Sequence, residues 1–104
     1  MAKMEFKEIR KSIREIFVNY KVFMLKLKLH DEHGHCHYQK NDIQRFKSFV
    51  RLVDAVLMQL PEEHTRLLKQ IELDNKQYSD LGYCRSSYYH NYKKAATLFM
   101  RYYQ

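Results

Sequence analysis

The sequence predicts an all-α fold, and three observations support that prediction. Only two Gly and one Pro occur in 104 residues, which leaves little material for the turns of a many-stranded β fold. Apolar residues recur at steps of three and four through most of the chain, the period of an amphipathic helix. With 45% hydrophobic and 14% aromatic residues, the chain has enough apolar side chains for one packed core.

The first element is a long amphipathic helix whose apolar residues extend from Phe6 to Leu27, with Lys and Arg on its other face. Part of this apolar stripe is expected to pack against the next helix. At the end of the segment, the run LKLKL at 25–29 also alternates with a period of two. A short β-hairpin through residues 30–37 is therefore an alternative for this region.

A histidine-rich polar loop at 30–40 follows and separates the first helix from a second one. Asn41 is a suitable N-cap, and Gln44 stands at the position that completes a capping box. Apolar residues then continue at helical spacing to Leu60. Residues 1–60 are thus predicted to form a helical arm of two long amphipathic helices.

The second half, residues 61–104, is predicted to form a helix-turn-helix. Pro61 suits the first turn of a new helix, and a short helical segment follows at 76–81. Gly82 is placed to end that segment in the left-handed conformation, and a longer helix follows over about 85–103. In this order of elements, the last helix is the one that enters the DNA major groove.

The charge balance favours an anionic partner. The chain has 19 Lys and Arg against 12 Asp and Glu, a formal charge of +7, and a pI near 9.4. Nucleic acid is the first candidate and an anionic membrane surface the second, and a solvated basic surface without a partner is the alternative. No apolar run approaches the roughly 18–20 residues that a membrane-spanning helix needs.

The final helix carries the candidate binding residues. From residue 85 to residue 104 there are four basic residues and no acidic ones. The predicted base contacts, in the first turn and a half, are Arg85, Ser86, Tyr89 and His90. The predicted contacts to the DNA backbone are Ser87, Lys93, Lys94 and Lys76. The alternative is that this helix only closes a bundle and has a solvated basic face.

Several of these motifs resemble region 4 of sigma factors. They are LPEE at 60–63, the leucine pair at 67–68, LGYCRSSYY at 81–89 and KKA at 93–95. The paired tyrosines followed by KKA look more like the phage late-transcription regulators of the ArpU/RinA type. These are small proteins with a helical amino-terminal arm and a sigma-like helix-turn-helix.

That resemblance implies that Arg85, Ser86, Tyr89 and His90 stand where the family contacts promoter bases. It also implies that Tyr88 is a core position, and that Leu81 and Ala95 are packing positions. Cys84 stands where the family usually has a capping serine. Cysteine caps helices poorly, so Ser86 or Ser87 are alternative caps that would shift the register of base contacts.

A second constellation lies in the histidine-rich loop. Imidazole and thiolate groups are good zinc ligands, and the candidates are His30, His33, His35, Cys36 and His37. No second Cys/His cluster completes a familiar zinc-finger spacing, so a polar surface loop is the preferred interpretation. No metal or other cofactor is expected.

The sequence therefore predicts a sequence-specific DNA-binding transcriptional regulator of phage or mobile-element origin. Its expected partners are double-stranded DNA, RNA polymerase, and a second copy that pairs through the Phe6–Leu27 stripe. The alternatives are an adaptor or inhibitor that binds polymerase without reading DNA, and the small subunit of a phage DNA-packaging enzyme. No catalytic motif is present, so an enzyme is not expected. Two Cys do not make a disulfide framework, and a cytoplasmic location is expected.

Overall fold

The computed structural model describes residues 5–33, 40–82 and 84–104, which are helical apart from short connections and contain no β-strand. This confirms the all-α prediction. The elements are α1 (Phe6–His33), α2 (Lys40–Gln59), α3 (Glu62–Leu68), the π-helical turn η1 (Lys69–Leu73), the 3₁₀ turn η2 (Tyr78–Leu81) and α4 (Arg85–Tyr103). None of these helices is long and apolar enough to cross a membrane.

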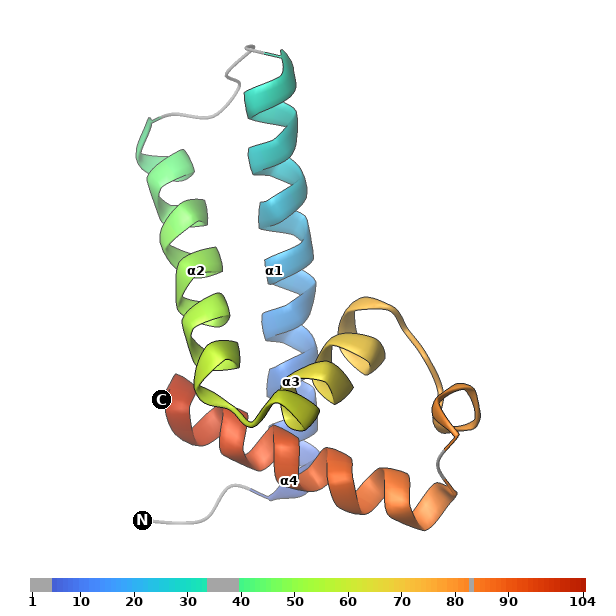
Figure 1. Cartoon of the computed structure of the whole chain (residues 1–104). Coiled ribbons are helices and arrows are strands. Elements are labelled where there is room, and N and C mark those ends of the chain that lie inside the picture. Colours follow the sequence, from blue (N-terminus) through green and yellow to red (C-terminus); the bar gives the residue numbers. More distant parts are fainter. Residues whose placement is uncertain (1–4, 34–39, 83) are drawn as a thin grey trace.

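The molecule is an antiparallel hairpin of α1 and α2 with α4 across one end (Figure 1). α3 starts at the end of α2 and packs on α4, while the opposite end of the hairpin projects away from α4 (Figure 1). The overall extents of 47 × 36 × 22 Å reflect this projecting hairpin.

The hairpin corrects two local expectations. α1 runs without interruption to His33, so the alternating run at 25–29 forms a helix and no β-hairpin begins there. Phe23 holds the two helices together, because its ring stacks on Phe46 at 4.7 Å and meets Phe49 edge-on at 5.2 Å between centroids. α2 begins at Lys40, so Asn41 lies inside the first turn and is not the cap; terminal residues of this kind are set by loop geometry as well as by capping preference.

The hydrophobic core lies where α1, α2, α3 and α4 meet. Phe17 of α1 and Phe99 of α4 are at its centre, with ring centroids 5.5 Å apart, and both are almost completely buried. Ala95 and Ala96 of α4 are fully buried in the same core. One continuous cluster thus includes residues from both predicted units, 1–60 and 61–104.

Two tyrosines connect the elements through polar contacts. The Tyr20 hydroxyl donates to Asp54 Oδ1 at 2.6 Å, which ties α1 to α2. The Tyr92 hydroxyl donates to Glu72 Oε1 at 2.6 Å inside the protein, which ties α4 to η1. Burial and then the hydrogen bond to Glu72 raise the pKa of Tyr92 further above neutral pH, and the phenol is a proton donor to Glu72.

We expect Tyr92→Phe to lower the free energy of unfolding by about 1–3 kcal/mol, because it leaves the Glu72 carboxylate buried without its donor. Urea denaturation followed by circular dichroism measures this change. Tyr102→Phe is the matched control, because Tyr102 is exposed on the same helix and should change stability little. Equal stability of the two variants would contradict the assigned role of the hydrogen bond.

Candidate nucleic-acid interface

The start of α4 fixes the register of the predicted binding residues. Gly82 has φ +74°, the left-handed conformation expected from the sequence. Cys84 is the N-cap residue, with extended backbone angles, and its side chain makes no capping hydrogen bond. Arg85 is therefore the first helical residue, and the alternative caps at Ser86 and Ser87 are not used.

The two faces of α4 differ sharply in burial. Its inner face is the part of the core formed by Tyr92, Ala95, Ala96, Phe99 and Met100. The predicted contact residues on α4 are all exposed: Arg85, Ser86, Ser87, Tyr89, His90, Lys93 and Lys94. The structure thus places the predicted base and backbone contacts of α4 in solvent, whereas Lys76 is exposed separately, between η1 and η2.

A chain of aromatic rings supports the exposed end of α4. The Arg85 guanidinium lies 5.9 Å from the centroid of the Tyr89 ring, within the range of a cation–π contact. Tyr89 meets Tyr88 edge-on at 5.3 Å, and Tyr88 stacks on the buried Tyr92 at 6.2 Å. Two of the four side chains predicted to read bases, Arg85 and Tyr89, are therefore connected to the core by ring contacts.

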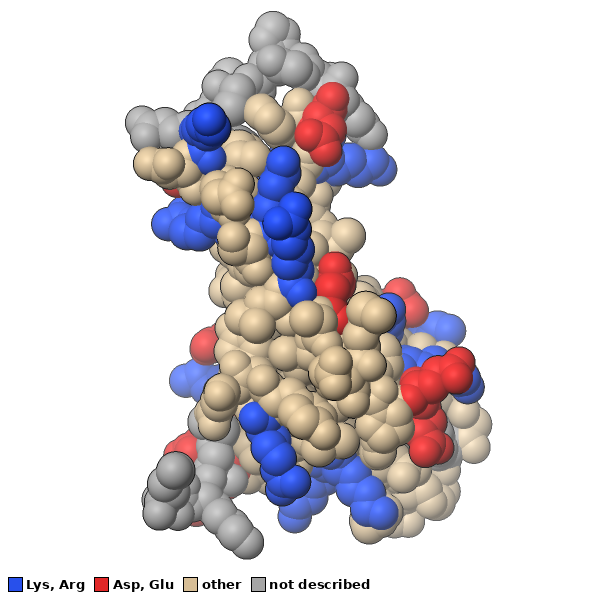
Figure 2. All heavy atoms as spheres, turned by 60° about the vertical axis from the view of Figure 1, so that its left-hand side comes forward, with Lys and Arg blue, Asp and Glu red and all other residues tan. Residues whose placement is uncertain are grey.

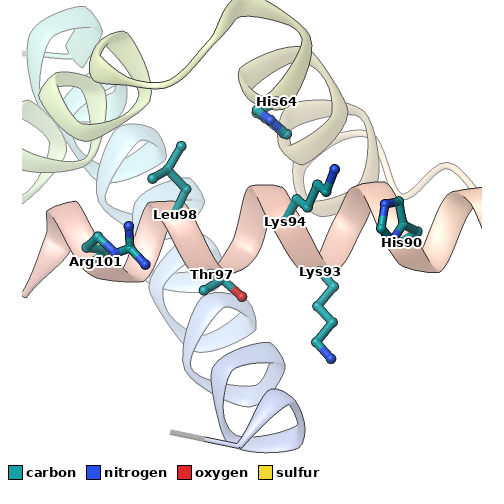
Figure 3. Close-up of a pocket in the computed structure, with 7 residues that line it drawn as sticks. All are labelled: His64, His90, Lys93, Lys94, Thr97, Leu98 and Arg101. Carbon is teal, nitrogen blue, oxygen red and sulfur yellow. The ribbon is translucent and has the colours of Figure 1, made fainter. Parts of the chain in front are cut away.

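A hollow of about 560 Å³ lies along the outer side of α4, and its lining residues are His64, His90, Lys93, Lys94, Thr97, Leu98 and Arg101. Figure 3 shows His64 of α3 directed towards Lys94, whereas Lys93 points to the other side of α4. The hollow contains cationic and imidazole groups but no acidic side chain. A phosphate group would meet the ammonium and guanidinium donors of Lys93, Lys94 and Arg101 there and no carboxylate.

Basic residues at the start of α1 lie near Tyr92 and Lys93 of α4. Phe6 contacts Tyr92 edge-on at 6.0 Å, and Lys93 Nζ lies 5.9 Å from the Phe6 ring. A second hollow, of about 360 Å³, is lined by Lys7, Arg10, Lys11, Arg14 and Glu15 of α1. Figure 2 shows Lys and Arg side chains along the lower edge of the molecule, where α4 and the beginning of α1 lie.

Four of the residues that line the α4 hollow were not among the predicted contacts: His64, Thr97, Leu98 and Arg101. Thr97 and Arg101 follow Lys93 and Lys94 at helical steps of three, four and seven, so a longer stripe along α4 would have found them. His64 has no such local signal, because its place depends on how α3 packs on α4.

The histidine-rich loop contributes no metal site within the described ranges. No group of three or more His, Cys, Asp or Glu residues in those ranges could hold a metal ion. His30 lies on the last turns of α1, and His33 ends that helix. The remaining zinc candidates, His35, Cys36 and His37, lie outside the described residues.

The interface has the dimensions for an extended polyanion. From Arg85 to Arg101, α4 rises about 24 Å at 1.5 Å per residue. The major groove of B-DNA is about 12 Å wide, so only one end of such a helix can reach base edges while the other lies near phosphates. The residues that can contact bases are at the amino-terminal end of α4, and they are Arg85, Ser86, Tyr89 and His90. Lys94 and Arg101 lie further along the helix.

The pKa of the Cys84 thiol depends on the geometry at the amino-terminal end of α4. Hydrogen bonds with the hydroxyls of Ser86 and Ser87, at 3.5 and 3.2 Å from Sγ, lower the pKa of Cys84 to about 7. In a chain with Cys36→Ser, we expect alkylation by iodoacetamide to reach half its maximal rate near pH 7, because the thiolate is the nucleophile.

Ser86→Ala should move that midpoint upwards, towards the ordinary value of a thiol, whereas Ser48→Ala on α2 should leave it unchanged. A midpoint at the ordinary thiol value in the Cys36→Ser chain would contradict the geometry of the Cys84–Ser87 turn.

Comparisons of the chain with protein-family models, with curated proteins and with solved structures found no match. The surface of α4 is therefore the basis on which a function can be assigned.

Proposed function

We propose that the chain binds double-stranded DNA in a sequence-specific manner and regulates transcription, with α4 as the helix that enters the major groove. The observation that carries this proposal is the outer face of α4, which is exposed, basic and free of acidic residues from Arg85 to Gln104. The order of elements supports it in part, since α3 with η1 precedes the longer α4. The short helix expected at 76–81 is only the 3₁₀ turn Tyr78–Leu81, so the eleven residues 74–84 separate η1 from α4, where a helix-turn-helix has a turn of about three to four residues.

The distribution of residues along α4 favours DNA over a merely solvated face. Arg can bind guanine through two hydrogen bonds, and Ser and His can each donate or accept at a base edge. These residue types occupy the amino-terminal end, while Lys94 and Arg101 further along suit phosphates. The Arg85–Tyr89 contact reduces the freedom of the side chain with the most specific base chemistry.

The pairing of two copies needs a different surface from the one the sequence suggested. Ile9, Ile13 and Ile16 of the Phe6–Leu27 stripe are buried in the chain's own core. A single helix-turn-helix offers one short reading surface, and such modules pair on two half-sites or gain affinity from a partner such as RNA polymerase. A role in phage or mobile-element transcription rests on the resemblance to sigma region 4.

The affinity for duplex DNA should fall as the salt concentration rises. In a plot of log affinity against log salt concentration, each phosphate contact should make the slope steeper by about 0.9. We expect Lys94→Ala to weaken binding to all duplexes and to reduce this slope, whereas Arg85→Ala should cost about 1–3 kcal/mol and relax base preference. Selection from a random duplex library, followed by mobility shifts over a salt series, measures both effects.

Lys47→Ala is the control for charge, because Lys47 is an exposed lysine on α2 that lines neither of the two hollows. Bound duplex should also slow alkylation of Cys84, which precedes the first helical residue of α4. If the parent chain selects no duplex, the DNA-reading proposal fails and an adaptor that binds polymerase or another regulator becomes the better assignment.

A further inference from the structure

The outward face of α1 changes character along its length. Its first half carries the cations Lys7, Lys11 and Arg14. Its second half carries four exposed apolar side chains, with exposed fractions of 58% for Val18, 40% for Val22, 57% for Leu25 and 44% for Leu29. We call these four residues the outer stripe.

The outer stripe has the geometry of a seam for one further helix. Its members are separated by steps of four, three and four residues, which places them within an arc of about 60° on a helix with 3.6 residues per turn. A stripe this narrow is typical of a coiled-coil contact, whereas a helix that packs on a globular core has a wider apolar face.

The distal part of the outer stripe is separate from the core contacts of α1, whereas Val18 and the neighbouring Lys21 line a hollow of about 190 Å³ with Ile71 and Glu72 of η1. Phe23 of α1 packs against Phe46 and Phe49 of α2, while α4 crosses the other end of the hairpin (Figure 1). Within the described ranges, the four side chains of the outer stripe are therefore open to solvent. Apolar residues that are exposed singly elsewhere on the surface are ordinary.

Lysines flank the middle of the outer stripe, whereas Glu15 precedes its first residue and Asp31 and Glu32 follow its last one. Between residues 16 and 30 the chain contains three lysines and no acidic residue. Lys21 and Lys28 follow one edge of the stripe, and Lys26 follows the other, where its Nζ lies 5.1 Å from the Phe46 ring. A helix that covered the stripe would place its own flanking residues next to these ammonium groups.

We propose that the outer stripe is the docking site for an acidic amphipathic helix of a partner protein, with apolar residues at steps of three and four and Asp or Glu on both edges. Such a helix would cover the Val and Leu side chains and face Lys21 and Lys28 with opposite charge. A second copy of α1 would instead bring lysines against lysines. The narrow stripe also offers less apolar face than helices that lie in a membrane surface.

This docking site does not depend on the proposed DNA binding. α4 lies at the opposite end of the hairpin from the distal turns of α1 (Figure 1), so both surfaces can be occupied together. A partner held there would give a single helix-turn-helix the additional affinity that its short reading surface lacks.

The test uses a fluorescein-labelled peptide of three heptads, with Leu at positions a and d and Glu at e and g, and a second peptide with Lys in place of Glu. Fluorescence anisotropy with the full chain should show binding of the acidic peptide in the micromolar range, and at least about tenfold weaker binding of the basic one. Leu25→Asp should weaken binding of the acidic peptide by at least about tenfold, because it places a carboxylate in the centre of the stripe.

Met58→Asp is the matched control, because Met58 is 83% exposed on α2 and lies outside the stripe. Lys21→Glu should weaken binding of the acidic peptide and strengthen binding of the basic one, a reversal that a general loss of folding cannot produce. Circular dichroism of each variant confirms that the helices are retained.

Equal affinity for the two peptides, or an unchanged affinity after Leu25→Asp, would overturn the proposal. A parent dimer that Leu25→Asp converts to monomer in light scattering would identify a second copy as the occupant instead. If the chain sediments with phosphatidylglycerol vesicles only when Leu25 is intact, and if it binds the two peptides equally, the occupant is a membrane surface. Variants of α4 that abolish DNA binding should leave peptide binding unchanged, so the two proposals fail separately.

Discussion

The structure depends on the close packing of α1 against α4. Phe17 and Phe99 meet at this crossing, and Ala95 and Ala96 of α4 are fully buried in the same core. Because this contact uses the inner face of α4, it determines which α4 side chains remain in solvent. The exposed basic face is thus a consequence of how the core is packed.

The hydrogen bond of Tyr92 and its ring contacts fix how α4 is oriented relative to α1 and η1. Tyr92 lies between the ring of Phe6 and the carboxylate of Glu72, so one side chain of α4 contacts both α1 and η1. On the same helix, Tyr88 and Tyr89 continue the ring contacts outward to Arg85. The amino-terminal end of α4 is thereby supported from the core, which is the arrangement a helix needs in order to present side chains at fixed positions.

Helical periodicity predicts most of the fold because it reports local geometry. The period of three and four located every long helix, and Gly82 and Pro61 marked real boundaries. α2 begins earlier than the predicted cap at Asn41, and the π-helical turn at Lys69–Leu73 was not predicted. The short helix predicted at 76–81 is only the 3₁₀ turn Tyr78–Leu81. A π-helical turn inserts one residue into a helix, and it has no distinct apolar period by which a short sequence could reveal it.

The sites were less predictable than the helices because they require tertiary contacts. The exposure of Arg85, Tyr89 and His90 agrees with the sequence pattern of α4, but the place of His64 depends on the packing of α3. The sequence indicated that the apolar positions of α1 exceed what one neighbour covers. Only the structure separates the buried Ile13 and Phe17 from the exposed Val22 and Leu25, since apolar residues occupy nearly every side of that helix.

The most direct test of the central claim, that α4 reads duplex DNA through its outer face, is a map of amide chemical shifts. Nitrogen-15-labelled protein is titrated with a duplex selected from a random library, and the shifts of every assigned amide are followed. We expect the largest changes on residues 85–94, with smaller ones at the beginning of α1. Changes confined to the distal turns of the α1–α2 hairpin, with the amides of α4 unaffected, would contradict the claim.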